Sequence, residues 1–197
     1  MRILLVRHGE SEWNAVRRLQ GQADIALSER GREQALRLRP AIEALAPEAA
    51  VASDLARAAE TARLLGVDAQ PEPGLREIDV GGWTGAEIAQ LQRDVPDDYL
   101  GWRAGTFAPE GGELWSDFRA RTAAAVARAC KETGGTVLAV CHGGVIRALV
   151  EHHLGIAPRL VISVGPASVT ALRLAEGEAR LGLFNYTPGT LDLAAPD

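Results

Sequence analysis

Three short apolar runs are spaced along the chain and predict buried strands. Residues 3–6 (Ile-Leu-Leu-Val), residues 49–53 and residues 136–141 are each bounded by polar residues or glycine. Runs of this length without a polar face are typical of strands buried inside a parallel sheet. Toward the C-terminus, residues 168–174 and 179–184 alternate apolar and polar positions, and this pattern predicts two further sheet strands.

Helices are predicted between these strands, each with a boundary signal of its own. Ser28 is placed to cap a helix that runs to Leu45, and Pro40 inside that stretch predicts a kink or a break. Asp54 is placed to cap a second helix, which runs up to a stop signal at Gly66. Strands and helices therefore alternate from the start of the chain.

The middle of the chain is expected to be less regular. Residues 70–85 hold two prolines and four glycines and predict mostly loop, with shorter helical pieces up to residue 104 and a loop over residues 106–112. Two longer helices are predicted over residues 113–133 and 143–154. This alternation predicts an α/β fold, a three-layer α/β/α sandwich around a mostly parallel sheet.

Length, charge and cysteine content narrow the classes of protein. The 197 residues contain no repeat, linker or low-complexity tract, so residues 1–197 are predicted to form a single domain. The net charge of −5 argues against a nucleic-acid partner or an anionic membrane, because both need a basic surplus. Cys130 and Cys141 lack metal-binding or redox spacing and suit a reducing compartment. With neither a signal-peptide core nor an apolar run of about 20 residues, we expect a cytoplasmic protein.

Histidines and arginines follow the three apolar runs directly. Arg7 and His8 end the first run, the second leads one helical turn later to Arg57, and His142 and Gly143 follow the third. In open α/β sheets ligands bind outside the carboxyl ends of the strands, so these side chains are expected along one rim. Taken singly, each residue also has a structural interpretation, such as a hydrogen-bonded histidine or a helical ion pair. Their convergence predicts an anion site with a candidate nucleophile.

Five segments carry a resemblance to a known family. They read LVRHGESEWN at residues 5–14, LSERGREQA at 27–35, SDLARAAETA at 53–62, LREIDVGGWTG at 75–85 and HGGVIRAL at 142–149. In this order they resemble the signatures of the histidine phosphatase superfamily, also called the phosphoglycerate mutase-like family. The resemblance implies the phosphoglycerate mutase-like fold, with a cap of loops and helices over roughly residues 80–112 inserted over the site.

The resemblance also implies roles for the residues at the rim. His8 matches the family's nucleophile, which attacks phosphorus in line and forms a phosphohistidine that water then hydrolyses. The other ring nitrogen must be held as a donor, and a backbone carbonyl near Gly9 is the expected partner. Arg7 and Arg57 match the arginines that clamp the phosphoryl oxygens, for which a guanidinium offers a permanent charge and a planar fork. His142 matches a further donor, expected to be protonated.

The remaining matches complete the expected site. Glu77 matches the family's general acid, and a carboxyl beside a phosphate dianion is expected to hold its proton because like charge disfavours the ionised form. As a carboxylate it would later activate water. Asn14 matches an asparagine that binds the phosphate, Gln20 and Gly21 match positions at the substrate entrance, and Gly143 offers a backbone N–H. No metal or other cofactor is expected, because arginines and histidines carry the positive charge.

Departures from the family's mutases favour a phosphatase. The mutases follow the last histidine with Gly-Asn, whereas Gly144 stands here. The mutases also carry an insertion with a lysine and paired arginines. In this chain the only lysine of residues 85–135 is Lys131, and no two arginines there are adjacent. Residues 109–113 instead resemble the Pro-Gly-Gly-Glu segment of the small bacterial phosphatases. We therefore predict a metal-independent phosphomonoesterase that acts on a small phosphorylated metabolite. The alternatives are phosphoglycerate mutase-type transfer and a phosphoprotein (phosphohistidine) phosphatase or regulatory module.

Three questions stay open at the level of sequence. The substrate class stays open between those of broad-specificity, α-ribazole, sugar-phosphate and phosphoserine-type phosphatases, and a homodimer is common among such proteins. Aromatic residues gather around the expected cap, where they either line a ring-binding pocket or pack as ordinary core: Trp83, Trp102, Phe107 and Trp115. Finally, the spacing of Cys141 and Arg147 matches the Cys-x5-Arg loop of cysteine phosphatases, an alternative nucleophile.

Overall fold

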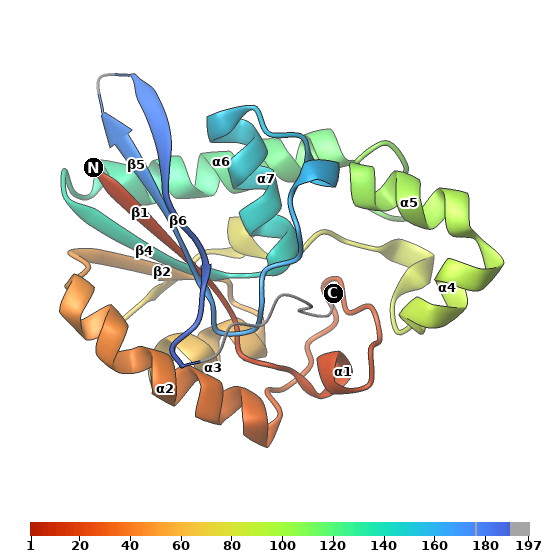
Figure 1. Ribbon diagram of the computed structural model, residues 1–197, viewed down its shortest axis with the longest axis horizontal. Coiled ribbons are helices and arrows are strands. Elements are labelled where there is room, and N and C mark those ends of the chain that lie inside the picture. The colour runs from red at the N-terminus through yellow and green to blue at the C-terminus, as the bar shows by residue number, and fades with distance from the viewer. Residues whose placement is uncertain (176, 190–197) are drawn as a thin grey trace.

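A six-stranded sheet forms the centre of the protein in a computed structural model that describes residues 1–175 and 177–189 (Figure 1). Its strands lie in the order β3-β2-β4-β1-β5-β6. They are β1 (Arg2–Arg7), β2 (Ala49–Ala52), β3 (Gln70–Pro71), β4 (Thr136–Cys141), β5 (Val169–Ala175) and β6 (Glu178–Tyr186). The first four run parallel, and β5 and β6 extend the sheet antiparallel beside β1. The prediction of an α/β fold with a mostly parallel sheet is confirmed.

Helices cover both faces of this sheet. They are α1 (Glu12–Ala15), α2 (Glu29–Leu45), α3 (Ala56–Leu64), α4 (Ile88–Asp94), α5 (Pro96–Ala104), α6 (Trp115–Lys131) and α7 (Gly143–Leu154). Short 3₁₀ turns lie at Pro73–Leu75, Gly81–Trp83 and Pro158–Leu160. Figure 1 shows α2 and α3 on one face, α6 and α7 on the other, and α4 and α5 projecting beside the sheet. The three layers agree with the predicted sandwich.

The two faces of the sheet support separate hydrophobic cores. On one face Ile3 and Leu5 pack with Phe118 of α6 and Ile146 of α7. On the other, Leu4 and Val6 join the apolar side chains of α2 and α3, such as Leu38. Because successive side chains of a strand point to opposite faces, the unbroken apolar run at residues 3–6 supplies both cores. This is the reason β1 lies in the middle of the sheet.

Two details of the helices differ from the predictions. Ser28 caps α2 as expected, accepting a hydrogen bond from Gly31 N at 3.0 Å. Pro40 does not break that helix. A proline removes the N–H that would bond to the carbonyl of Leu36, and both residues lie on the exposed side of α2. Asp54 does not cap α3, whose N-cap is Leu55, because its carboxylate pairs with Arg76 instead. The first α3 amide, Ala56 N, donates to Asp24 Oδ1 at 2.7 Å.

The single domain over residues 1–197 stays a prediction, and residues 190–197 of it lie outside the described part. The segment expected as a cap, residues 80–112, contains α4, α5 and the turn at Gly81–Trp83. Across residues 1–175 and 177–189, no helix combines the length and hydropathy required to cross a membrane.

Candidate active site

The carboxyl ends of three neighbouring strands place Ser53, His142 and His8 side by side. The strands β2, β4 and β1 are adjacent and parallel, and Arg7 of β1 is in register with Cys141 of β4. His8 N donates to the Cys141 carbonyl at 2.9 Å, so the two histidines emerge at the same level. Their ring centroids lie 5.1 Å apart, edge to face. Register therefore brings together residues that are 134 positions apart in the sequence.

The ring of His8 is held in one tautomer. Its Nδ1 lies 2.6 Å from the carbonyl oxygen of Gly9, and because a carbonyl can only accept, Nδ1 carries the proton and Nε2 keeps its lone pair. The expected backbone anchor is thus confirmed. Burial, and then the charges of Arg57 and Arg7, hold the pKa of His8 well below its usual value, so the imidazole is neutral near pH 7. His8 therefore combines a fixed ring with an available nitrogen nucleophile.

Gly9 is a glycine because no side chain fits there. A Cβ at this position would lie 2.3 Å from the carbonyl oxygen of Gly31 in the first turn of α2. The Gly9 amide donates to Thr61 Oγ1 at 3.1 Å, and Thr61 in turn donates to the Arg57 carbonyl at 2.7 Å. The loop after β1 is thus packed against both α2 and α3, which explains how the rigid carbonyl behind His8 arises.

Arg57 lies in the first turn of α3 and is almost fully buried, with 1% of its surface exposed. Its Nη1 donates to the Ala23 carbonyl at 2.7 Å and its Nη2 to the Gly21 carbonyl at 2.8 Å. Burial lowers the pKa of Arg57 to about 10, which still leaves the guanidinium charged at neutral pH. Arg57 therefore supplies a permanent positive charge and fixes the entrance loop at Gly21, whose φ of +51° suits glycine.

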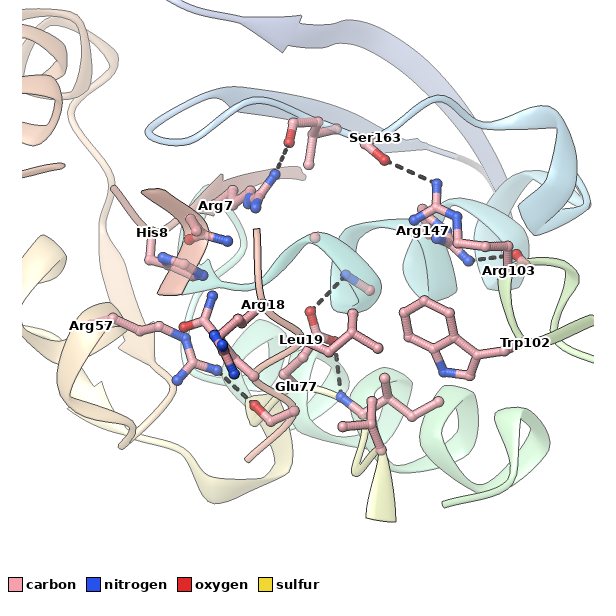
Figure 2. Close-up of a pocket in the computed structure, with 18 of the residues that line it drawn as sticks. Arg7, His8, Arg18, Leu19, Arg57, Glu77, Trp102, Arg103, Arg147 and Ser163 are labelled. Atoms are coloured by element: carbon pink, nitrogen blue, oxygen red, sulfur yellow. Dashed lines mark hydrogen bonds between the residues drawn. The ribbon is translucent and has the colours of Figure 1, made fainter. Parts of the chain in front are cut away.

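Arg7, the last residue of β1, supplies the second guanidinium and is 5% exposed. Its Nη1 donates to the carbonyl of Val164, in the segment that precedes β5. Both Arg7 and Arg57 line the same pocket as His8 (Figure 2). Two buried cations on one wall create a strong preference for an anion, since each has lost most of its hydration.

His142 is the N-cap of α7 and is not among the residues that line the pocket, although its ring lies against that of His8. Its Nε2 is 2.9 Å from Ser53 Oγ, and its buried Nδ1 makes no hydrogen bond within the described residues. Burial, and then the charge of Arg57, hold the pKa of His142 well below its usual value. Desolvation thus favours the neutral ring, and the expectation that His142 is protonated when it binds a phosphoryl group stays a prediction.

Glu77 lies in the irregular loop between the turns at Pro73–Leu75 and Gly81–Trp83. Its carboxylate accepts hydrogen bonds from Ile78 N at 2.8 Å and from Gly144 N at 3.0 Å. A Cβ on Gly144 would come within 2.2 Å of Glu77 Oε1. The carboxylate thus occupies the space that a side chain at position 144 would fill, and the bond from Gly144 N holds it against the N-terminus of α7.

Asn14 and Gln20 are joined through Ser11. Asn14 closes a capping box on α1, a helix that the sequence analysis missed because it is only one turn long. Ser11 lies 3.0 Å from Asn14 Oδ1 and 2.8 Å from Gln20 Oε1 through its Oγ. With both carbonyl oxygens engaged, each side chain has its NH₂ group to offer a ligand. Both residues line the pocket, as does Gly143.

The pocket is lined by eight of the nine predicted site residues, and His142 is the exception. The lining also contains Trp102 and Trp115, two of the aromatic residues expected near the cap. Sequence reasoning did not assign the rest of the lining to the site: Arg18, Leu19, Ile78, Val80, Arg103, Gly144, Arg147, Ser163 and Val164. Figure 2 places two groups on opposite sides: Arg7, His8 and Arg57 against Trp102, Arg103 and Arg147. Of the aromatic residues near the cap, Trp102 and Trp115 line the pocket, whereas Trp83 packs between Trp102 and Phe107.

Cys141 does not fit the alternative role of nucleophile. Its side chain is fully buried in the core that faces α6 and α7, and it is absent from the lining of the pocket. Burial also raises the pKa of its thiol, which suppresses the reactive thiolate. Within the described residues, no cluster of His, Cys, Asp or Glu is arranged to hold a metal ion.

A buried histidine fixed for attack beside two buried arginines defines a class of phosphoryl-transfer site. Comparison with known families gives the particular one: residues 3–187 match the family model of the histidine phosphatase superfamily (branch 1). The chain belongs to this superfamily, and it is a phosphoric monoester hydrolase. The resemblance found in the five sequence segments is thereby confirmed.

Named relatives lie on both sides of the choice between phosphatase and mutase. The chain is 39% identical over 162 residues, 75% of its length and 73% of the relative's, to a glucosyl-3-phosphoglycerate phosphatase of Mycobacterium tuberculosis. It is 36% identical over 168 residues, 79% and 76% of the two lengths, to a probable phosphoglycerate mutase of Enterobacter sp.. A mycobacterial glucosyl-3-phosphoglycerate phosphatase solved as a complex with VO3 superposes with a TM-score of 0.88 and 35% identity, covering 94% of this chain and 99% of the other.

Proposed function

We propose that this protein hydrolyses small phosphate monoesters through a phosphohistidine on His8 Nε2, without a metal ion. The observation that carries the proposal is the state of His8: a neutral ring whose Nδ1 donates to Gly9 while Nε2 is left to attack. The buried guanidinium groups of Arg7 and Arg57 line the same pocket and favour the charged phosphoryl group. Catalysis of phosphoryl transfer consists mainly of such positioning and electrostatic stabilisation.

The reaction takes place in two displacements. In the first, the Nε2 lone pair attacks phosphorus, the phosphorus–oxygen ester bond breaks, and the departing alkoxide takes a proton from Glu77. In the second, water attacks the phosphohistidine, gives its proton to the Glu77 carboxylate, and the phosphorus–nitrogen bond breaks. The products are the alcohol and inorganic phosphate, and both His8 and Glu77 return to their starting states. Asn14 and the N–H of Gly143 donate to phosphoryl oxygens. His142 packs edge to face against the ring of His8 and helps to hold it in place.

The substrate is a small phosphorylated metabolite whose alcohol part lies against Leu19, Val80, Trp102 and Trp115. This choice rests on the apolar side chains of the lining beyond the cationic wall. Relatives that are named glucosyl-3-phosphoglycerate phosphatases make phosphorylated sugar acids the first esters to test. We expect the protein to act in the cytoplasm; a homodimer, which is common among such proteins, is the assembly to test.

The proposal is tested with p-nitrophenyl phosphate at pH 5 to 8 in the presence of EDTA. The wild-type protein should turn over, and His8→Ala should lose at least about 10³-fold in kcat. Labelled phosphate should be trapped on the wild-type protein in an acid-labile, base-stable form and should be absent from His8→Ala. His152→Ala, which removes an exposed histidine of α7, is the matched control. Turnover that survives in His8→Ala would refute the mechanism.

Phosphoglycerate mutase activity is the second candidate, because one group of relatives carries that name. Against it stands Gly144, because the Cβ of the asparagine that the family's mutases have there would lie 2.2 Å from Glu77 Oε1 and would displace that carboxylate. Isomerisation of phosphoglycerate at a rate well above its hydrolysis would favour the mutase. If no small ester is hydrolysed or isomerised, a phosphoprotein becomes the substrate to test.

A further inference from the structure

Glu77 has no regular secondary structure to hold it in place. Residues 76–80 form neither helix nor strand, yet a proton donor must be placed to within a fraction of an ångström to be effective. The two amides that bind the carboxylate, Ile78 N and Gly144 N, fix its end but not the backbone that carries it. Something else must therefore fix the main chain of this loop, the acid loop (residues 74–79).

Arg121 of α6 provides this support. Its Nη1 donates to the carbonyls of Gly74 at 3.0 Å and of Arg76 at 2.8 Å, and its Nη2 donates to the carbonyl of Glu77 at 3.0 Å. Its Nε and Nη2 donate to the two carboxylate oxygens of Glu113 at 2.6 and 2.8 Å. A guanidinium has five N–H groups, and these five bonds use all of them.

Glu113 connects the same arginine to the far end of the acid loop. Its backbone N donates to the Asp79 carbonyl at 2.9 Å, and its carboxylate lies 3.3 Å from Asp79 N. The ion pair is largely shielded, with side-chain exposures of 26% for Arg121 and 17% for Glu113. The guanidinium also lies 4.9 Å above the ring of Phe118. One rigid pair therefore binds both ends of the acid loop to the longest helix on this face of the sheet.

We propose that Arg121, with Glu113 as its counter-ion, is the positioning residue for the Glu77 general acid. Arg121 is absent from the lining of the pocket, so it acts through the acid loop and not on the substrate. Lysine is a poor replacement, because its three donors on a single nitrogen cannot bind three carbonyls and a carboxylate in one plane. The inference rests on the proposed role of Glu77, and the experiment separates the two.

The experiment compares kcat/KM for p-nitrophenyl phosphate, whose leaving group needs no proton, with kcat/KM for an alkyl phosphate, whose leaving group does. Arg121→Met should lower the alkyl value about 10²-fold, as expected for a misplacement near 1 Å, and the nitrophenyl value by less than about tenfold. Arg121→Lys should fail to restore the alkyl value. Arg128→Met is the matched control, because Arg128 of the same helix pairs with Glu72 beside the acid loop but binds none of its carbonyls.

Two further measurements decide between outcomes. In a Glu77→Gln background, Arg121→Met should cost little more on the alkyl ester, because a residue that acts only through Glu77 loses its effect when Glu77 is gone. Glu113→Gln, which keeps Arg121 and is the gentler change, should reproduce the selective loss if Arg121→Met does not fold. Equal losses on both esters, while Glu77→Gln is selective, would overturn the role of Arg121 alone. If Glu77→Gln itself is not selective, the proposed general acid is refuted and the inference falls with it.

Discussion

Gly144→Ala should separate the chemistry of Glu77 from the stability of the fold. The added Cβ would lie 2.2 Å from Glu77 Oε1, whereas ordinary contact begins at about 3.4 Å, so the carboxylate must move by about 1.2 Å. The atom that the Cβ would meet is the carboxylate end of a flexible side chain and not backbone, so the Glu77 side chain can move away. Alanine is also the better helix former, by up to about 1 kcal/mol over glycine. We therefore expect the variant to fold with nearly unchanged stability.

The same displacement should be costly for catalysis. A shift near 1 Å of a catalytic group lowers the rate about 10²-fold, which corresponds to about 2.7 kcal/mol in the transition state. The loss should appear in kcat/KM for an alkyl phosphate, where Glu77 must give a proton, and should be less than about tenfold for p-nitrophenyl phosphate.

The assay measures both esters and the thermal midpoint on the same preparations. Gly134→Ala is the control for the substitution itself, because a Cβ at Gly134 meets nothing within 4 Å. Equal losses on the two esters would refute the reasoning, since they would mean that the methyl group disturbs phosphate binding and not proton donation. A fall of many degrees in the midpoint would also refute it, because the collision would then extend beyond one side-chain end.

Two other predictions concern buried groups. Burial first, and then the charge of Arg57, hold the pKa of His8 and of His142 well below 6.5. Below about pH 6.5 the unfolded chain therefore binds protons that the folded protein does not, and the free energy of unfolding should fall steadily from pH 7 to pH 5. Urea midpoints across that range check it, and a His8→Asn/His142→Asn variant with an unchanged pH slope would contradict it. Cys141→Ala should keep kcat/KM within about threefold, because the thiol is buried away from the pocket with a raised pKa, and iodoacetamide should leave the wild-type enzyme active; inactivation would restore a role for the thiol.

The parts of the fold that follow from burial were predictable from the sequence. A strand buried on both faces must be apolar throughout, so β1 and β4 stand out in the sequence. The edge strand β3 has two exposed residues and therefore carries no such pattern. Pro40 shows the converse. It lies on the exposed side of α2, where the loss of one backbone hydrogen bond does not end the helix. Local sequence patterns therefore do not predict an element whose exposure is set by the tertiary structure around it.

The site was predictable as far as strand ends determine it. Arg7 ends a strand that the sequence identifies, and His8 and His142 each follow one directly. Because the two strands are parallel neighbours, these side chains must lie close together. The two arginines of the opposite wall were not predictable, because Arg103 comes from α5 and Arg147 from α7. Only the tertiary fold makes them neighbours, with Arg147 donating to the Arg103 carbonyl at 2.7 Å. In the sequence alone, an arginine on a predicted helix is interpreted as a solvated or ion-paired side chain.

The acid loop shows why a motif identifies a catalytic group more readily than the residues that support it. Glu77 is visible in the sequence because it lies in a recognisable segment, but its carboxylate depends on Gly144 and its backbone on Arg121, which are 67 and 44 positions away. Each of these reads as something ordinary in isolation, a turn glycine and a helical arginine. What makes them functional is a geometric requirement: a glycine because the carboxylate fills its side-chain space, and an arginine because only five planar donors can bind three carbonyls and a carboxylate together. Substitutions at such supporting positions should therefore change proton donation before they change the binding of phosphate.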